Sequence, residues 1–457
     1  GTTTLASITW GGTSSRLSIN GQTLTINGAV SGAGSLVGSS TSNLTLNGTA
    51  GTVNFDQTTD ASVATLTGSN ALNNLTLGAL GNVTLGNKVN LFGILTAPSG
   101  STLALGDGNL VFRNTATTTA RIATIAGVVP TITGTATSEI YIHAQRRAWR
   151  FITNPTPIAG GTIANNWQSN FGLGDNYGTN IYGPVVANGL NSPATISASM
   201  MKFNSNLNTT GGYDNVTNTS VDLDGTYFMF VRGDKNVVAV PNGTPAAFTP
   251  TTLASKGTIK TGQQTVTLNG LDGRYGAIPN PYLSPVDVSL LTYTGIAGNN
   301  ASYHWDPNKG GTNFGGWETI NSTTWGGISD FRKNMQIGQS ALVLINSATA
   351  SVVFEEADKV STKTTQQTGA GNGLQDNFKT TLNIANTDGT KTRVDEMFVA
   401  FKNGYNSNFD GNEDAVKMNN SGENLSSKRN NTLIAIEARP YIQNDDSIFM
   451  SFTNTRV

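Results

Sequence analysis

The chain has 457 residues but contains no cysteine and only two histidines, His143 and His304. The absence of cysteine excludes disulfide bonds, thiolate metal sites and a thiol nucleophile. The two histidines are far apart in the sequence, whereas a zinc site normally needs clustered ligands. A serine–histidine–aspartate triad can assemble from distant positions, but both histidines are better explained as structural residues of a strand and a turn. We therefore predict that the chain is not an enzyme.

Charge is scarce as well, because 12% of the residues are charged and the formal net charge is −1. Proteins that bind nucleic acid usually carry a basic patch, and the densest basic cluster here is only Arg146, Arg147 and Arg150. No nucleic-acid partner is therefore expected. No apolar run approaches the ~20 residues that span a bilayer, so we expect no transmembrane segment. If the chain is secreted, we expect its signal peptide to have been removed or to lie outside this sequence.

The residues that are abundant favour β-structure. Glycine makes up 53 of the 457 residues, and threonine and asparagine dominate the polar residues. Threonine favours strands, whereas glycine and asparagine favour tight turns. Long runs of good helix formers at helical spacing are missing. We therefore predict an all-β chain, long enough for two to four modules at ~150 residues per domain.

The first part of the chain carries an internal repeat of short apolar–polar–apolar pieces, each followed by a turn. One series of these pieces recurs about every 20 residues, at Leu24, Leu44, Val63, Val83 and Leu103. A second series with the same spacing runs through Phe55, Leu75 and Leu95. Two interleaved series predict coils with at least two strands each, as in a β-solenoid. The alternative is an ordinary β-sandwich, whose strands recur about every 8–12 residues.

The repeat stops near residue 138, and aromatic strands separated by loops rich in glycine, asparagine and proline follow. This pattern is typical of antiparallel sandwiches or jelly rolls. We predict β-solenoid repeats over 1–137 and a β-sandwich module over 138–350. For 351–457 we predict either a second β-sandwich module or the completion of the first.

Five motifs occur in a fixed order in the predicted sandwich region: Arg147–Pro155, Asn166–Gln168, Gly178–Gly183, Phe230–Lys235 and Asn280–Asp287. This order resembles a module of large surface proteins that Bacteroidetes export through the type IX secretion system. The resemblance implies an extracellular or cell-surface location and a role in adhesion. Proteins of that kind normally also end in a sorting domain, which is not recognised here. Arg232-Gly233-Asp234 spells an integrin-type tripeptide, but we interpret it as a strand end and turn.

One segment is a candidate calcium loop, the only cofactor site that the sequence suggests. Oxygen-bearing side chains alternate in it at Asn406, Asn408, Asp410, Asn412 and Asp414. This spacing resembles the first part of an EF-hand loop. Lys417 stands where the bidentate glutamate of an EF-hand belongs, so an EF-hand is excluded and a looser extracellular calcium loop is predicted. The alternative is a polar hairpin turn that needs no ion.

Three tryptophans, Trp305, Trp317 and Trp325, lie in a glycine-rich stretch. Exposed aromatic rings can stack on sugars or anchor a partner protein, so these three are candidate ligand contacts. The alternative is that they are buried inside a sandwich. The expected partners are an extracellular surface, a glycan or further copies of the chain.

Three functions remain open. The first is a secreted surface adhesin, in which the solenoid is a rigid spacer and the sandwich loops contact the target. The second is a subunit of an extracellular filament, assembled by end stacking or by strand addition at Ile448–Phe452. The third is a polysaccharide-active β-helix enzyme, which needs two acids in one groove. The repeats contain only Asp56, Asp60 and Asp107 as acids, so the third is disfavoured.

Overall fold

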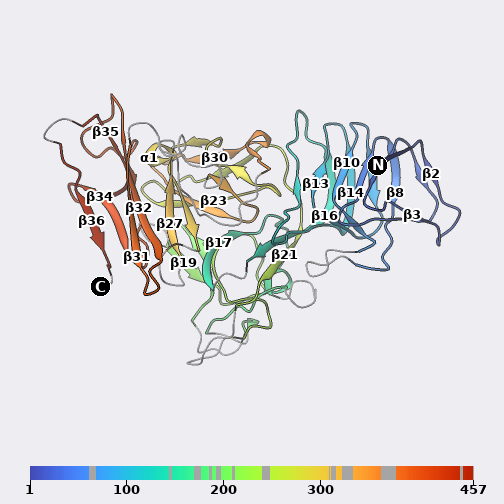
Figure 1. Ribbon diagram of the computed structural model, residues 1–457, viewed down its shortest axis with the longest axis horizontal. Helices are drawn as coiled ribbons and strands as arrows, with labels where there is room; N and C mark the ends of the chain where they lie inside the picture. The colour runs from blue at the N-terminus through green and yellow to red at the C-terminus, as the bar shows by residue number, and fades with distance from the viewer. Residues whose placement is uncertain are drawn as a thin grey trace.

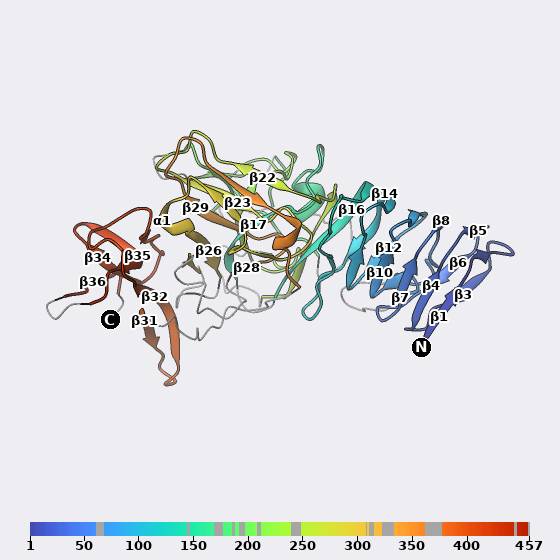
Figure 2. The same ribbon diagram turned by 90° about the horizontal axis from the view of Figure 1, so that it is seen from above.

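The computed structural model is an elongated, nearly all-β molecule. It describes residues 1–457 except 61–67, 144–146, 169–176, 185–187, 192–196, 208–211, 239–247, 308, 310–314, 322–332, 362–376, 443–445 and 456–457. Strands account for 48% and helices for 3% of the structure, which confirms the all-β prediction. The N-terminal strands lie at one end of the long axis and the C-terminal strands at the other (Figures 1 and 2). In the described part of the chain, no helix has the length and apolar character needed to cross a membrane.

The N-terminal part is built from parallel strands that stack along the long axis. One six-stranded sheet contains β1 (Thr2–Leu5), β4 (Thr23–Ile26), β7 (Asn43–Leu46), β10 (Asn74–Leu77), β13 (Ile94–Thr96) and β15 (Arg121–Ile122). Its strands alternate between buried and half-buried residues, as in the iBiB pattern of β4, β7 and β10. Their inward leucines therefore form one row across the sheet, in which Leu24 pairs with Leu44 and Leu44 with Leu75.

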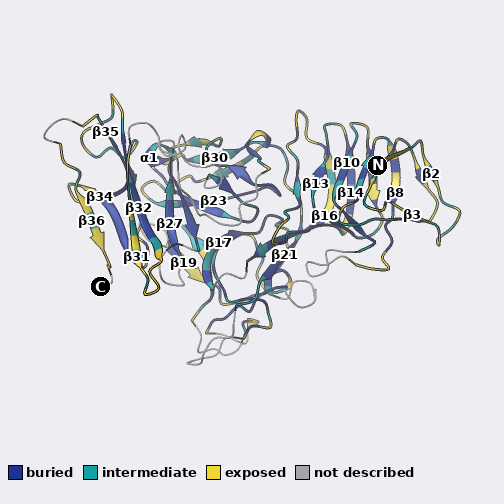
Figure 3. Cartoon of the chain, in the orientation of Figure 1, coloured by how far each residue is buried: buried dark blue, intermediate teal, exposed yellow. Residues whose placement is uncertain are grey.

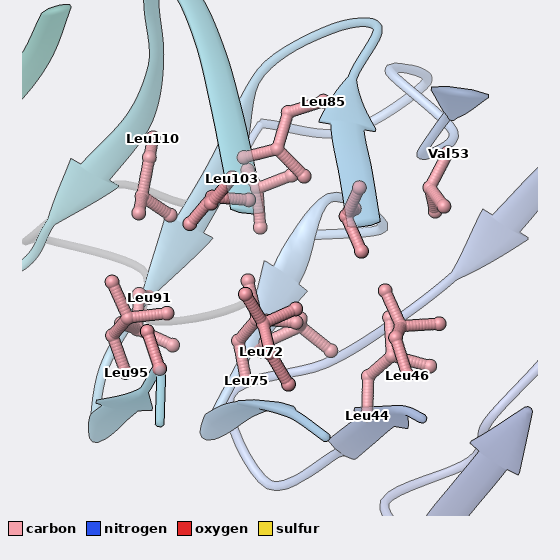
Figure 4. Packing of buried hydrophobic residues seen from close by; sticks show 14 of the residues in the cluster. Leu44, Leu46, Val53, Leu72, Leu75, Leu85, Leu91, Leu95, Leu103 and Leu110 are labelled. Atoms are coloured by element: carbon pink, nitrogen blue, oxygen red, sulfur yellow. The ribbon is translucent and has the colours of Figure 1, made fainter. Parts of the chain in front are cut away.

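Further parallel strands complete each turn of the stack. One ladder contains β8 (Thr49–Val53), β11 (Asn82–Leu85), β14 (Thr102–Phe112) and β16 (Thr131–Ile142), and β9 (Ala71–Leu72) and β12 (Val89–Leu91) pair alongside it. Near the N-terminal end the parallel pairs are β2 (Ile8–Thr9) with β5 (Val30–Ser31), and β3 (Arg16–Ser18) with β6 (Ser35–Val37). The leucines of facing strands point into one shared interior (Figure 4). Leu72, Leu75, Leu95 and Leu103 are all fully buried there.

The strand register corrects the two predicted series of repeats. Leu75 and Leu95 continue the sheet of Leu44, rather than belonging to a separate series. Phe55 does not pair with Leu75, because it bridges to Leu36 on another face. Val63 lies outside the described residues. The cause is the long connection between β8 and β9, which makes the step along the chain from Leu44 to its partner Leu75 longer than the other steps, while the apolar pairing between neighbouring turns is preserved.

Close packing between turns of the stack depends on Gly38. A Cβ atom at this position would overlap the carbonyl oxygen of Ala71 on the next turn. The amide of Gly38 also donates a 2.7 Å hydrogen bond to the carbonyl of Ser69. We therefore expect Gly38→Ala to lower the free energy of unfolding by about 1–3 kcal/mol, because the two turns must move apart.

Gly12 provides the control for this prediction, because a Cβ atom there would meet nothing within 4 Å. Urea unfolding of both alanine variants measures the difference. Equal midpoints for Gly38→Ala and Gly12→Ala would contradict the proposed close approach.

The strand β16 connects the parallel stack to the antiparallel sheets that follow. It pairs parallel with β14 on one side and antiparallel with β21 (Thr251–Gly257) on the other. Because β21 covers the outer edge of β16, that edge is not left open for pairing with another chain. The predicted module boundary at residues 137 and 138 thus falls inside a continuous strand.

Antiparallel sheets form the middle of the molecule. One four-stranded sheet contains β17 (Ala148–Thr153), β20 (Thr226–Val231), β18 (Met200–Asn204) and β19 (Gly212–Asn215). A second contains β23 (Tyr275–Pro279), β29 (Ser340–Leu344), β26 (Ser302–Asp306) and β27 (Gly316–Ile320). An aromatic cluster with residues from both sheets includes Phe151, Tyr303 and Trp317. Dark blue strands in Figure 3 mark this buried region.

Smaller elements complete the middle region. The strands β22 (Gln264–Thr267), β30 (Ser351–Phe354) and β25 (Thr292–Thr294) form a three-stranded sheet, and β24 (Val286–Asp287) pairs with β28 (Asn334–Met335). The helical segments in the described residues are short: η1 (Ala164–Gln168), α1 (Ala297–Asn300) and η4 (Glu356–Asp358). Because β30 lies between β22 and β25, the residues just after the predicted boundary at 350 belong to the preceding sheets.

A six-stranded sheet forms the C-terminal part. It contains β31 (Asn377–Ala385), β32 (Lys391–Phe401), β35 (Thr432–Arg439), β34 (Asn424–Arg429) and β36 (Met450–Thr453), with β33 (Ala415–Val416) paired to β35. Pairing is antiparallel except between β32 and β35. Met397, Val399 and Leu425 form a small buried cluster on this sheet.

Candidate functional site

Two of the three tryptophans predicted as ligand contacts are buried. Trp305 on β26 and Trp317 on β27 are directly opposite each other in the antiparallel ladder, and their exposed fractions are 9% and 8%. The two rings pack edge to face, with centroids 5.1 Å apart. The indole nitrogen of Trp305 also donates a 2.7 Å hydrogen bond to the carbonyl of Trp149 on the facing sheet.

This burial corrects the prediction of a direct contact role for these two residues. The rings of Phe151 and Phe228 from the first sheet also pack against Trp317. Neither tryptophan therefore presents a ring face on which a sugar could stack, and both serve as core residues between the sheets. Trp325 lies outside the described residues.

The predicted calcium loop is closed by its own hydrogen bonds. The carboxylate of Asp414, which is 1% exposed, accepts the amide protons of Asp410 at 2.8 Å and Ala438 at 2.8 Å. The side-chain oxygens of Asn406 and Asp410 accept the amides two residues further on, at 2.9 Å each. These are local turns of the kind that asparagine and aspartate form without an ion.

An arginine also engages this loop. The guanidinium of Arg429 donates to the carbonyl oxygens of Asn406 and Asn408, at 3.3 and 2.8 Å, and lies 3.8 Å from the carboxylate of Asp414. Among the described residues, no group of three or more histidines or acids is arranged to hold a metal. Calcium binding therefore stays a prediction. A ligand that binds only the folded chain raises the unfolding midpoint, so unfolding with calcium and with chelator tests it.

The Arg232-Gly233-Asp234 tripeptide is a turn at the end of β20. Asp234 is 4% exposed, and its carboxylate accepts the amide of Asn236 at 2.9 Å. The guanidinium of Arg232 lies over the rings of Phe230 and Tyr182, at 4.7 and 5.2 Å from their centroids. The tripeptide is thus held inside the fold, in agreement with its interpretation as a structural turn.

The two histidines lie apart: His143 follows β16 directly, and His304 lies within β26 rather than in the predicted turn. His143, after β16, packs its ring against Tyr141. His304 on β26 is 5% exposed, and its Nε2 lies 2.9 Å from the hydroxyl of Ser302. Burial lowers the pKa of His304 from 6.5 to about 4. The imidazole is therefore neutral in the folded protein near neutral pH.

We expect His304 to make stability depend on pH. The unfolded chain binds a proton at this residue below pH 6.5, whereas the folded chain binds it only near pH 4. The stability that neutral His304 supports is thus complete above pH 6.5 and is lost as the pH falls toward 4, by up to about 3 kcal/mol.

The variant His304→Gln cannot titrate, so it provides the baseline for carboxylates that also protonate in acid. Urea unfolding of both proteins across this pH window measures the effect. The wild type should lose more stability than the variant, and parallel profiles would show that His304 is not responsible.

The three acids of the N-terminal repeats lie in separate polar contacts. Asp56 forms a 2.8 Å ion pair with Arg16, and Asp107 forms a 3.0 Å ion pair with Lys256. Asp60 accepts hydrogen bonds from the amide groups of Asn70 and Asn90, at 2.9 and 2.8 Å. Among the residues that the structure describes, no contact joins two of these three acids, so they give no specific support to a paired-carboxylate mechanism.

Several charged side chains are buried together in a cluster between the middle and C-terminal sheets. The carboxylate of Asp395 on β32 lies between two ammonium groups. The Nζ atom of Lys417 is 2.8 Å from Oδ1 and 2.6 Å from Oδ2, and the Nζ atom of Lys309 is 3.0 Å from Oδ1. The exposed fractions of these side chains are 0% for Asp395, 3% for Lys417 and 2% for Lys309.

Further contacts hold these three groups in place. The Nζ atom of Lys309 also donates a 2.6 Å hydrogen bond to the carbonyl of Trp317. The amide of Leu425 donates to Oδ2 of Asp395 at 2.6 Å. Glu318 and Glu396 line the same small cavity as both lysines. Buried charges of this density are stable only when they are paired and hydrogen-bonded.

This cluster could not be found from the sequence. Its members come from β32 and from the segments after β26 and β33, and no short motif connects them. Lys417 is notable because the sequence marks it only as the residue that excludes an EF-hand.

Comparison with known proteins finds no matching family model, no matching curated protein and no matching solved structure.

Proposed function

We propose that the chain is a non-catalytic, extracellular surface protein of the kind exported by type IX secretion, and that it acts as an adhesin. In this proposal the N-terminal parallel stack is a β-solenoid that serves as a rigid spacer. The antiparallel sheets form β-sandwich modules, and their loops contact a glycan or a protein on the target surface.

The main support for this proposal is that the parallel stack continues directly into the antiparallel sheets. The strand β16 belongs to both parts, and a buried network crosses the junction. In that network Arg113, the residue after β14, contacts Glu139 on β16, and it also donates 2.7 and 2.9 Å hydrogen bonds to Tyr177 and Asn90. A joint without a free linker keeps the distal modules at a fixed distance and direction from the stack, as a spacer requires.

Electron microscopy and binding of the purified chain test the proposal together. We expect isolated, elongated particles that bind glycans or target cells. A monomer without affinity for any tested glycan or cell would contradict adhesion, whereas regular fibres would favour the second candidate. Imaging in the presence of a chelator also tests calcium binding. If removal of calcium disrupts the elongated particles or the fibres, the Asn406–Asp414 loop is implicated.

The second candidate is a filament subunit, and the C-terminal strand favours it. The strand β36 pairs with β34 and lies at the end of its sheet. Phe449, Met450 and Phe452 in and beside it are 69%, 44% and 51% exposed. Exposed apolar edge strands readily pair with another chain. Met450→Lys should abolish assembly in sedimentation experiments if this edge forms the filament, and unchanged fibres would exclude this edge.

A further inference from the structure

The contacts of Asp395 resemble the arrangement of reactants for an amide bond. The nucleophile candidate, Nζ of Lys417, is within 2.8 Å of both carboxylate oxygens, so it is also close to the carbon between them. Both side chains are shielded from water. Holding two reacting groups together in this way replaces an encounter in solution with an intramolecular step.

The two lysines differ in how easily they lose a proton. Burial, together with the charge of Lys309, lowers the pKa of Lys417 to about 8. Burial alone would lower the pKa of Lys309 too, but Asp395 and Glu318 raise it above its ordinary value. Lys417 is therefore the amine that can become neutral and attack, whereas Lys309 keeps its positive charge.

We propose that Lys417 and Asp395 condense spontaneously into an intramolecular isopeptide bond. The lone pair of Nζ of Lys417 attacks Cγ of Asp395, forming the C–N bond. The C–Oδ2 bond breaks, and Oδ2 leaves as water with two protons from the ammonium group. The ammonium and the carboxylate thus become one neutral amide and one water molecule, without any oxidant or activating co-reactant.

The surrounding groups fit this reaction. Lys309 donates to Oδ1, the oxygen that gains negative charge when Nζ adds to Cγ, and a fixed positive charge at that place stabilises such an intermediate. Glu318 is 2% exposed and lines the same cavity as both lysines. In this proposal Glu318 carries a proton from Nζ of Lys417 toward the leaving oxygen. The Trp317 carbonyl holds Lys309 in position.

The product also relieves an energetic cost. Two ammonium groups and one carboxylate are buried together before the reaction, and burying charge is costly even when it is paired. Condensation removes one positive and one negative charge from this interior. The bond would link β32 to the segment after β33 in the C-terminal sheet, which would resist unfolding of that sheet under load.

Mass spectrometry of the intact, denatured wild-type chain tests the proposal. We expect a mass lower than that of the sequence by one water, and a tryptic peptide pair linked through Lys417 and Asp395. The full sequence mass would overturn the proposal. A linked pair containing Lys309 in place of Lys417 would overturn the assignment of the nucleophile. The primary measurement needs no variant, so it does not depend on a mutant that folds.

Variants then test the roles of the groups. Lys417→Arg keeps the positive charge but cannot form the amide, so it should restore the full mass. Lys428 is an exposed lysine on the nearby strand β34, and Lys428→Ala should keep the mass deficit. Glu318→Gln should leave a large uncondensed fraction if Glu318 carries the proton. Complete condensation in this variant would overturn that role.

Discussion

Replacing Arg113 with alanine is expected to lower the free energy of unfolding by about 3–5 kcal/mol, because the change leaves the carboxylate of Glu139 buried without its cation. The side chains of this pair are 2% and 0% exposed. Burial already raises the pKa of Glu139, and the guanidinium of Arg113 opposes that shift. Urea unfolding near neutral pH measures the loss.

Two controls separate this effect from a general loss of charge. The double variant Arg113→Met and Glu139→Leu removes both charges, so it should recover part of the stability. The exposed pair Lys202 and Asp224 has side chains 48% and 58% exposed, and Lys202→Ala should cost no more than about 1 kcal/mol. A double variant as unstable as Arg113→Ala would show that the unpaired carboxylate is not the cause.

Replacing Trp317 with alanine is expected to cost about 3–5 kcal/mol, because the change opens a cavity between the two middle sheets. Its ring lies 5.5 Å from Phe151 and 5.1 Å from Trp305, measured between centroids. The backbone of Trp317 also contacts two side chains, since its amide donates to Asn420 at 2.6 Å and its carbonyl accepts from Lys309. Thermal or urea unfolding measures the loss.

Trp317→Phe distinguishes a core role from a contact with a ligand. This variant keeps most of the packing, so it should fold and lose less stability than the alanine variant. If Trp317 is a core residue, each folded molecule of the variant should bind a target as well as the wild type does. Loss of binding in a stable variant would instead indicate that Trp317 contacts the ligand.

The local pattern predicts individual strands well, but not their partners. Leucines in apolar–polar–apolar pieces lie on buried faces, as at Leu24, Leu44 and Leu75. The predicted pairing of the strands was partly wrong, because a fixed period assumes that every turn has the same length. The connection between β8 and β9 breaks that assumption, and only contacts across the stack decide that Leu44 pairs with Leu75.

For the candidate sites, too, the sequence predicts which residues are unusual but not which residues they contact. The sequence marks Trp305, Trp317 and the Asn406–Asp414 loop as unusual, but it does not show which atoms surround them. The facing sheet buries the two tryptophans, and Arg429 comes from a later strand to contact the loop. Neither contact has a sequence signal, because each joins residues that are distant along the chain.

The sequence by itself determined the all-β class, the repeated strands of the first part and the turn at Arg232-Gly233-Asp234. Those features depend on neighbouring residues, whose preferences for strands and turns act locally. Only the tertiary structure decided which strands stack, which aromatic residues are buried and that Lys309, Asp395 and Lys417 meet in one interior. The physical reason is that burial and charge pairing depend on distances between residues far apart in the chain, which no local pattern records.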